Sequence, residues 1–312
     1  MTALICGSMA YDNIMVFRGR FRDHILPDQI HILNVAFLVP EMRQELGGCA
    51  GNIAYNLRLL GGAPLIMATV GRDFDRYRAR LREQGLDARF ITELPQTLTA
   101  QAFITTDLDD NQITAFHPGA MDHAHVNQVP RDAGVSIGMV SPDGRQAMIE
   151  HAAQFSAAGI PFIFDPGQGL PMFDGEDLRG FVGQAAWVTV NDYEGRLLCE
   201  RTGWSETEIA ARVRALIVTR GAQGSTIFAG DQRHDIPPVV PASVSDPTGC
   251  GDAYRAGLLH GLLHGLGWEE TGRLASLIGA LKIAHRGTQN HSFTRASLAA
   301  DYQRAFGRTL AL

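Results

Sequence analysis

Short apolar runs alternate with longer segments of helical periodicity along most of the chain. The apolar runs are rich in β-branched and aromatic residues, as strands are, and cover residues 3–6, 65–70, 135–141, 161–165, 186–190 and 215–219. Helical spacing covers residues 49–61, 73–85, 143–158 and 192–214, with more helix after residue 250. Because the strands are apolar at nearly every position, helices should cover both faces of a mostly parallel sheet. The pattern predicts a three-layer α/β/α fold of the doubly wound type.

Two segments depart from this rhythm. Residues 15–46 and 98–119 alternate apolar and polar positions, which is typical of half-buried strands. The second segment contains AQAFITTDLDDNQITAF, a hairpin pattern with Asp109, Asp110 and Asn111 at its turn. We expect the two segments to pair into a small β-sheet that forms a lid. No linker, repeat or low-complexity tract interrupts residues 1–312, so we expect a single domain that carries this lid.

The composition excludes several classes of protein. With 312 residues, 45% of them hydrophobic and 19% charged, the chain can bury a full core. Its formal net charge of −6 argues against a nucleic-acid or acidic-membrane partner. The sequence shows no signal peptide, and no apolar run reaches the roughly 18 residues of a membrane span. The four cysteines form no CxxC pair and suit reduced thiols, so we expect a cytoplasmic protein.

Lysine is almost absent from the sequence: Lys282 is the only one, and arginine supplies the other strongly basic side chains. Two classes of ATP-binding protein require a lysine in a fixed context. Walker A loops need Gly-Lys-Ser/Thr, and protein kinases need a strand lysine together with HRD and DFG. The sequence contains neither set. Any mechanism that requires a lysine elsewhere in the chain is therefore excluded.

The stretch SDPTGCGDAYRAGLLHG (245–261) places glycines directly before an apolar helix. Backbone N–H groups at a helix start lack partners and carry partial positive charge, so Gly249, Cys250 and Gly251 should form an anion-binding nest. Asp252 would repel a phosphate there, but it suits a base that takes a proton from a hydroxyl while the nest holds transferred charge. We expect the helix N-terminus to keep Asp252 ionised. Alternatively, the glycines form only a turn and Asp252 only caps the helix.

A second glycine turn, GGCAGNIAYNLRLLGG (47–62), opens another helix. With both motifs present, the chain resembles the ribokinase-like (PfkB) family of carbohydrate and nucleoside kinases over its whole length. The N-terminal family signature matches GGCAGNIAYNLRLLG, and the C-terminal signature matches DPTGCGDAYRAGLL. The shorter family landmarks GSMAYDN, VGRDFD, NDYE and TRGAQG also occur in order. Within the family, AFHPGAM and RGTQNHSF look most like bacterial adenosine kinases.

The resemblance implies a ribokinase-like fold with a β-sheet lid, and ATP- and Mg²⁺-dependent phosphorylation of a sugar hydroxymethyl group. The similarity to bacterial adenosine kinases implies that the acceptor is the 5′-hydroxyl of adenosine and that the product is AMP. In this scheme Asp252 is the catalytic base, and the anion hole lies at Gly249, Cys250 and Gly251. The matching substrate residues are Asp12, Gly48 and Asn52 for the ribose, with Phe103 and Phe116 of the hairpin as candidates for stacking on the base from one face of the lid.

The resemblance also implies where the nucleotide and cations bind. Asn191 and Glu194 match the motif that positions Mg²⁺ and phosphate through water, which suits a hard, hydrated cation. The loop that lines the ATP site is matched by Thr219, Gly221 and Gly224. Many family members bind a monovalent cation beside the anion hole, and Asp246 and Thr248 match part of that site. Backbone near Gly287 would complete it, but His291 stands where some relatives have a small hydroxyl residue, so potassium activation is an open question.

Three further expectations concern alternatives, assembly and Cys250. The alternative functions are a sugar kinase for ribose or fructose, and a nucleoside-binding protein without turnover.

Exposed lid edges favour a homodimer formed through the lid. The family usually has a small apolar residue at the position of Cys250. A thiol at a helix N-terminus can have a lowered pKa, so modification of Cys250 is expected to inhibit, unless the thiol simply fills the place of an alanine.

Overall fold

The computed structural model describes residues 1–25, 34–109 and 111–310. Within these residues the larger sheet has nine strands. They are β1 (Thr2–Cys6), β4 (Leu65–Gly71), β5 (Asp87–Leu94), β8 (Val135–Val140), β9 (Phe162–Phe164), β10 (Trp187–Asn191), β11 (Ala215–Thr219), β12 (Ser225–Ala229) and β13 (Gln232–Ile236). Their order is β13-β12-β11-β10-β9-β8-β1-β4-β5, and pairing is parallel from β11 to β5. Only the pairs β11–β12 and β12–β13 are antiparallel, so the mostly parallel sheet is confirmed.

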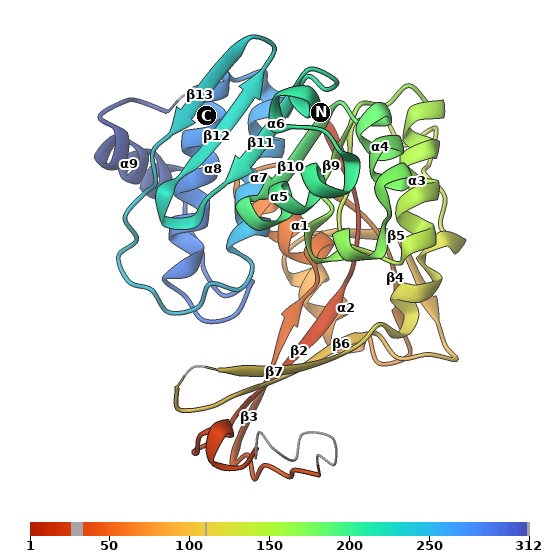
Figure 1. Cartoon of the computed structure of the whole chain (residues 1–312), viewed down its shortest axis with the longest axis vertical. Coiled ribbons are helices and arrows are strands. Elements are labelled where there is room, and N and C mark those ends of the chain that lie inside the picture. Colours follow the sequence, from red (N-terminus) through yellow and green to blue (C-terminus); the bar gives the residue numbers. More distant parts are fainter. Residues whose placement is uncertain (26–33, 110, 311–312) are drawn as a thin grey trace.

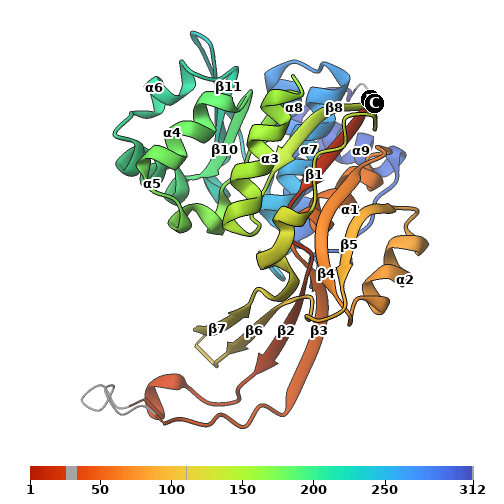
Figure 2. The ribbon, with the colours of Figure 1, turned by 90° about the vertical axis from the view of Figure 1, so that its right-hand side faces the viewer.

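Helices cover both faces of this sheet (Figure 1, Figure 2). One layer contains α1 (Cys49–Leu59), α2 (Asp75–Glu83), α7 (Cys250–His264) and α8 (Trp268–Ile283), with α9 (Arg295–Phe306) packed on α8. The other layer contains α3 (Arg145–Ala157), α4 (Gly175–Gln184), α5 (Asp192–Thr202) and α6 (Glu206–Ala210). Successive strand residues alternate between the two cores: in β1, Leu4 packs towards α3 and Ile5 towards α1. This alternation explains the continuous apolar strands.

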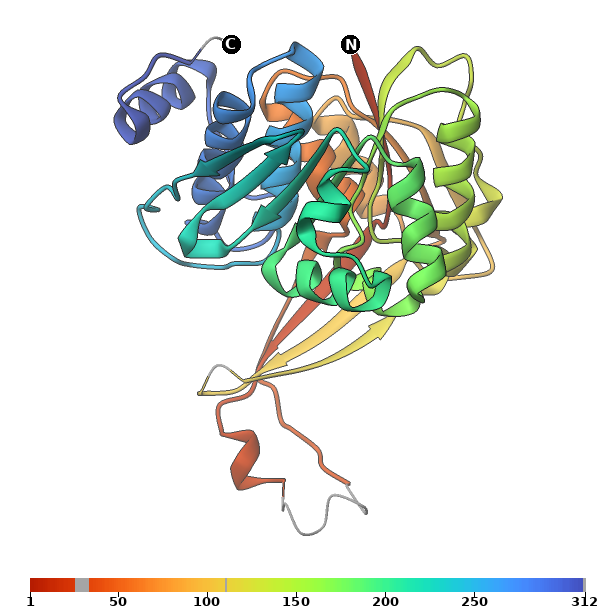
Figure 3. The same ribbon diagram turned by 45° about the horizontal axis from the view of Figure 1, so that its top comes forward.

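A second sheet projects from one end of the molecule, away from both chain termini (Figure 1, Figure 3). We call it the lid sheet. Its strands are β2 (Ala10–Val16), β3 (Glu41–Gly47), β6 (Ala100–Thr106) and β7 (Gln112–His117), in the order β3-β2-β6-β7. The predicted hairpin is β6–β7. Asp107 organises its turn by accepting the N–H groups of Asp109 and Asn111, and Asp110 lies outside the described residues.

The prediction that residues 15–46 are alternating strands throughout is wrong. Among its described residues, strand covers only the end of β2 and most of β3, and β2 begins earlier, at Ala10. Between the two strands, the rings of Phe17, Phe21 and Phe37 pack together, with centroids 4.8–5.9 Å apart. These apolar side chains therefore pack in an aromatic cluster instead of forming one face of a strand.

Other element boundaries differ because of local signals. The helix predicted over 192–214 is two helices, since α5 ends at Gly203 in the left-handed conformation and Ser205 caps α6. The short 3₁₀ helices η3 (Gly119–Val126), η4 (Gly167–Met172) and η5 (Gly221–Gln223) lie in connections. Sequence analysis missed β5, α4 and the β12–β13 hairpin. These elements lie at the sheet edge or on its surface, where the apolar pattern is weaker.

Strand register divides the lid sheet into two faces. Asp12 pairs with Ala102 and Ala102 with Phe116, so these side chains share one face. Phe103 pairs with Ala115 and therefore lies on the opposite face. Met42, Phe103 and Ile113 share that opposite face and are all exposed. The expected homodimer would form through the exposed edges of this sheet, which are β3 and β7, and it stays a prediction.

Candidate active site

A polar cavity of about 440 Å³ opens where the parallel strands β9, β10 and β11 end, and Asp12 of the lid sheet reaches it. Doubly wound sheets bind ligands at this edge. Its walls are formed by Asp12, Gly48, Cys49, Asn52, Pro142, Asp165, Gly167, Gln168, Asn191, Glu194, Thr219, Gly221, Thr248, Gly249, Gly251, Asp252 and Arg255. The fold thus brings residues of both glycine motifs together with residues of the strand ends, although these segments lie far apart in the sequence.

The N-terminus of α7 presents its first turn to this cavity. Gly249 is the N-cap, with φ +78°, and a Cβ there would lie 3.0 Å from the Cγ2 of Thr288. Gly249 and Gly251 line the polar cavity. Cys250 does not: its N–H donates to the carbonyl of Pro247 at 3.2 Å, and its side chain lines a neighbouring cavity. The predicted three-residue anion hole is therefore corrected to a site in which Cys250 offers no free N–H group.

Asp252 opens onto the polar cavity from this first turn. Its Oδ2 accepts a hydrogen bond from the Nδ2 of Asn52 at 2.8 Å. Protein atoms surround the carboxyl group on its other sides, and this burial raises its pKa to about 6, while the bond from Asn52 lowers it. Although Asp252 lies at a helix N-terminus, desolvation is the largest cause acting on its pKa and raises it. With a pKa near 6, Asp252 is still mostly ionised at pH 7.

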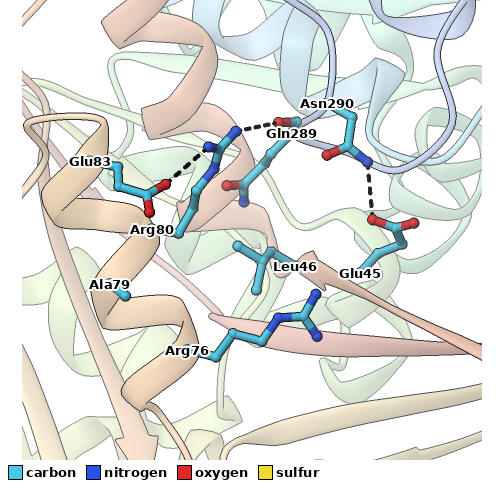
Figure 4. A pocket seen from close by; sticks show the side chains of 8 residues that line it. All are labelled: Glu45, Leu46, Arg76, Ala79, Arg80, Glu83, Gln289 and Asn290. Carbon is cyan, nitrogen blue, oxygen red and sulfur yellow. Dashed lines mark hydrogen bonds and ion pairs between the residues drawn. The ribbon is translucent and has the colours of Figure 1, made fainter.

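Asn52 is held in place from behind by Gln289. The Nε2 of Gln289 donates to the Oδ1 of Asn52 at 3.0 Å and to the hydroxyl of Tyr77 at 2.6 Å. The Tyr77 hydroxyl donates in turn to the carbonyl of Gly47. An outer cavity of about 330 Å³ lies on the far side of Gln289, between α2 and β3 (Figure 4). A chain of hydrogen bonds therefore runs from this outer cavity to Asp252.

Asp12 faces the polar cavity from β2. Burial raises its pKa to about 6, and the neighbouring carboxylate of Asp252 adds to this shift. Glycine is required beside it, since a Cβ on Gly47 would lie 2.4 Å from the Oδ2 of Asp12. Gly48 has φ +87° and lies close to the backbone of Met9. The glycine turn before α1 thus leaves room for a carboxylate on the cavity wall.

Arg255 and Asp165 form a buried ion pair that sequence analysis missed. The guanidinium donates to both carboxylate oxygens, with Nε–Oδ2 at 3.1 Å and Nη2–Oδ1 at 2.8 Å. Burial by itself would lower the pKa of Arg255, but Asp165 raises it further, so the charge is retained. A Cβ on Gly251 would lie 3.2 Å from the Nη1 of Arg255. The sequence did contain a signal for this ion pair: Arg255 lies three positions after Asp252 in a mostly apolar helix, where a charged side chain needs a partner.

Asn191 and Glu194 fix each other at the start of α5. The Oδ1 of Asn191 accepts the N–H of Glu194, and the Oε2 of Glu194 accepts the N–H of Asn191, each at 2.8 Å. Burial raises the pKa of Glu194, whereas the guanidinium of Arg255, 3.9 Å from its Oε2, lowers it. In the described part of the chain, no group of three or more acidic, His or Cys side chains could enclose a metal. These two residues therefore fit a hydrated cation better than a directly ligated one.

An apolar cavity of about 300 Å³ adjoins the polar one. The two cavities share Thr219, Gly221 and Gly251, so they meet at the N-terminus of α7. Gly224 lines the apolar cavity, where a Cβ would lie 2.1 Å from the carbonyl oxygen of Ile236. The remaining walls are mostly aliphatic: Pro238, Val239, Pro241, Val244, Ala280 and Ile283. The cavity fits a flat apolar group whose polar end reaches the α7 turn.

The predicted potassium site does not fit the residues present. Both oxygens of the Asp246 carboxylate accept backbone N–H groups, from Thr248 and Gly287, each at 2.9 Å. These bonds lower the pKa of Asp246 against the opposing effect of burial. The carbonyl of Asp246 accepts a hydrogen bond from the ammonium of Lys282 at 2.7 Å. Burial lowers the pKa of Lys282, and the carboxylate of Asp246 opposes that shift.

Two further expectations need correction. Phe103 and Phe116 cannot both stack on one ligand from the same face of the lid, because strand register places them on opposite faces. Only Phe116 shares the face of Asp12, and neither ring lines the polar cavity. The thiol of Cys250 does not have a lowered pKa: burial raises it to about 11, although Lys282 lowers it somewhat. The raised pKa agrees with the alternative interpretation, in which the thiol of Cys250 stays protonated and simply fills the place of an alanine.

Comparison with known proteins places the chain in a family. The profile of the pfkB family of carbohydrate kinases matches residues 10–295. The chain belongs to this family. It is 55% identical to the nucleoside kinase of Burkholderia thailandensis, solved in complex with inosine, with a TM-score of 0.91 over 98% of this chain and 99% of that one. The same protein in complex with ADP and inosine gives a TM-score of 0.88 at 56% identity, covering 99% of this chain and 97% of that one.

A curated relative agrees with this assignment. The nucleoside kinase of Methanocaldococcus jannaschii is 30% identical over 261 residues, which are 83% of this chain and 85% of the relative. The ribokinase-like fold with its separate small sheet, inferred from the two glycine motifs, is therefore confirmed. In the described part of the chain, no helix is long and apolar enough to cross a membrane.

Proposed function

We propose that this kinase transfers the γ-phosphoryl group of ATP to the 5′-hydroxyl of a nucleoside, with adenosine as its substrate and AMP as the product. The observation that carries the proposal is Asp252, an ionisable carboxylate at a helix N-terminus where a polar and an apolar cavity meet. The similarity to nucleoside kinases, one of them bound to ADP and inosine, supports the same assignment. In this scheme the nucleoside occupies the polar cavity and the adenine of ATP the apolar one.

Asp252 acts as the general base. Its carboxylate accepts the proton of the 5′-hydroxyl as the hydroxyl oxygen forms a bond to the γ-phosphorus. The bond from that phosphorus to the oxygen bridging it to the β-phosphate breaks, and ADP leaves with that electron pair. The N-terminus of α7 lies beside the transferred group, and the guanidinium of Arg255 beneath Gly251 adds fixed positive charge.

Asp12 and Asn52 suit the ribose hydroxyls. A carboxylate accepts two hydrogen bonds from vicinal hydroxyls, and Asp12 lies on the cavity wall with the turn at Gly48 beside it. Because Asp12 comes from β2, the lid sheet itself would contact the nucleoside and close over it. Phe116 shares the face of Asp12 and is the aromatic residue we retain as a contact for the base.

Mg²⁺ would be held through water by Glu194 and Asn191, and when bound it neutralises phosphate charge. The capping contacts between the two side chains fix the direction in which Glu194 faces the cavity. Thr219 and Gly221 line both cavities and therefore mark the path from the adenine to the phosphates. These assignments use only groups that already border the two cavities.

The proposal is tested by measuring ADP release from MgATP with adenosine, inosine, guanosine, cytidine, ribose and fructose offered separately. We expect turnover with adenosine to exceed that with either free sugar by a wide margin, because the base adds binding energy that the sugars lack. Turnover with ribose or fructose alone would make the protein a sugar kinase. Absence of turnover with all six would leave a nucleoside-binding protein as the function.

A further inference from the structure

Lys282, the only lysine of the chain, is buried behind the N-terminus of α7. Its side chain comes from the last turn of α8 and is 0% exposed. The Nζ atom lies 2.7 Å from the carbonyl oxygen of Asp246 and 3.2 Å from that of His285. A buried charge needs such partners, because an unpaired charge in a protein interior is strongly unfavourable. Two backbone carbonyls thus hold one positive charge at a fixed point.

That point adjoins the first residue of α7. The carbonyl oxygen of Asp246 that accepts from Lys282 also lies 4.0 Å from the Sγ of Cys250. The two carboxylate oxygens of Asp246 are engaged separately, with the N–H groups of Thr248 and Gly287. The ammonium is therefore a cation placed directly behind the turn that contacts the transferred phosphoryl group.

We propose that the ammonium of Lys282 takes the place of the monovalent cation found beside the anion hole in many relatives, so that this enzyme works without potassium. Proteins hold potassium with backbone carbonyl oxygens, and the carbonyl of Asp246, a residue of the expected site, already accepts from Lys282, as does the nearby carbonyl of His285. The imidazole of His291 carries no oxygen, and the backbone carbonyl of His291 already accepts from the hydroxyl of Tyr55. The role of this charge in catalysis rests on the phosphoryl transfer proposed above.

The test compares the unaltered protein with two variants of Lys282. Lys282→Ala removes the ammonium and opens space for an ion, whereas Lys282→Met removes the charge but keeps the volume. Arg286→Ala is the matched control, because it deletes one positive charge from an exposed position four residues away. Each protein is assayed in KCl, in methylammonium chloride and in tetramethylammonium chloride at equal ionic strength. Initial rates and thermal unfolding midpoints are both recorded.

We expect the unaltered protein and Arg286→Ala to show the same rate and the same unfolding midpoint in all three salts. Lys282→Ala should lose about tenfold in kcat in tetramethylammonium, less than the loss of a direct oxyanion donor, because the charge acts through the α7 turn. Potassium or methylammonium should restore part of that rate. Lys282→Met should be equally slow, and neither ion should rescue it, because the methionine side chain fills the space.

Three results would overturn the proposal. One is potassium stimulation of the unaltered protein, and another is a Lys282→Met variant with full activity in tetramethylammonium. The third is a Lys282→Ala variant that neither potassium nor methylammonium rescues, because the lysine would then be structural. If Lys282→Ala does not fold, the proposal can still be overturned by potassium stimulation of the unaltered protein or by full activity of Lys282→Met in tetramethylammonium. The unfolding midpoints need no substrate: potassium should raise that of Lys282→Ala and leave that of the unaltered protein unchanged. This readout holds even if no nucleoside is turned over, which separates failure of this inference from failure of the proposed function.

Discussion

The N-termini of α1 and α7 meet across one cavity, yet they are built from different chemistry. Each follows a glycine with positive φ, +87° at Gly48 and +78° at Gly249. The α7 turn carries charge: Asp252 on the cavity wall, Arg255 beneath it and Lys282 behind it. The side chains that the α1 turn presents are neutral, with Cys49 and Asn52 on the same cavity.

The difference indicates a division of tasks between the two turns. In the proposed reaction, charged groups at α7 would accept the proton of the hydroxyl and stabilise the charge of the transferred phosphoryl group. Neutral hydrogen-bonding groups at α1 can orient partners without altering the net charge of the site. Asn52 shows this relation, because it donates to Asp252 and is itself held by Gln289. Substitutions at α7 should therefore change the rate more than substitutions behind α1.

The largest effect is expected from Asp252→Asn, which removes the base with almost no change of shape. The amide oxygen can still accept from Asn52, so the fold should be kept. We expect kcat to fall by about 10²–10⁴-fold, the usual contribution of a general base, with little change in nucleoside binding. Steady-state kinetics and isothermal titration with adenosine measure the two quantities. If Asp252→Asn binds adenosine normally and its rate of phosphoryl transfer is no lower than that of the unaltered protein, the result would support a nucleoside-binding protein instead of a kinase.

A smaller effect is expected from Arg255→Met, which removes charge from beneath the α7 turn. We expect kcat to fall by about 10²-fold, as for the loss of one oxyanion-stabilising donor. The single variant should also lose about 3–5 kcal/mol of stability, because Asp165 is left buried without its partner. Asp165→Asn in the same chain should restore much of that stability, as measured by urea unfolding.

The double variant separates the two roles of this ion pair. If Arg255 acts on the phosphoryl group, the rate stays low although stability returns. Full recovery of the rate in the double variant would show that the pair only holds α7 against the strand end at Asp165.

Much of the fold could be predicted from sequence because its signals are local. The buried strands are continuous apolar runs, and both glycine turns stand directly before the helices that they open. The lid strands were harder to delimit, since Phe17, Phe21 and Phe37 lie between β2 and β3 and are apolar because they pack on one another, not because they belong to a strand. The α7 and α1 turns could be placed, but the chain alone gave no distance between them.

The parts of the site that could not be predicted depend on contacts between distant segments. Arg255 meets Asp165, 90 positions away, and Gln289 meets Asn52, 237 positions away. The raised pKa of Asp252 was not predicted, and the pKa direction of Cys250 was misjudged, for the same reason. A helix N-terminus is visible in a sequence, whereas the desolvation that outweighs it comes from the packed surroundings.

The smallest expected effect tests the α1 side of the comparison through Gln289→Leu. This substitution keeps a similar volume but removes the amide that donates to the buried Oδ1 of Asn52 and to the buried hydroxyl of Tyr77, so we expect a loss of about 1–3 kcal/mol of stability. Asn52 then loses the donor to its Oδ1. We expect less than about a tenfold loss of kcat/KM at neutral pH, the scale of one hydrogen bond.

The pH profile carries the sharper result for this variant. The bond from Asn52 lowers the pKa of Asp252, so a less fixed Asn52 should let that pKa rise above its value of about 6. Because the base must be ionised, the acidic limb of kcat/KM should move to higher pH. Asn290→Ala is the control, since Asn290 lines the same outer cavity but donates to Glu45 instead of Asn52 (Figure 4). An unmoved acidic limb in Gln289→Leu would mean that Asn52 keeps its orientation from α1 alone, and the hydrogen-bond chain behind it would then be structural.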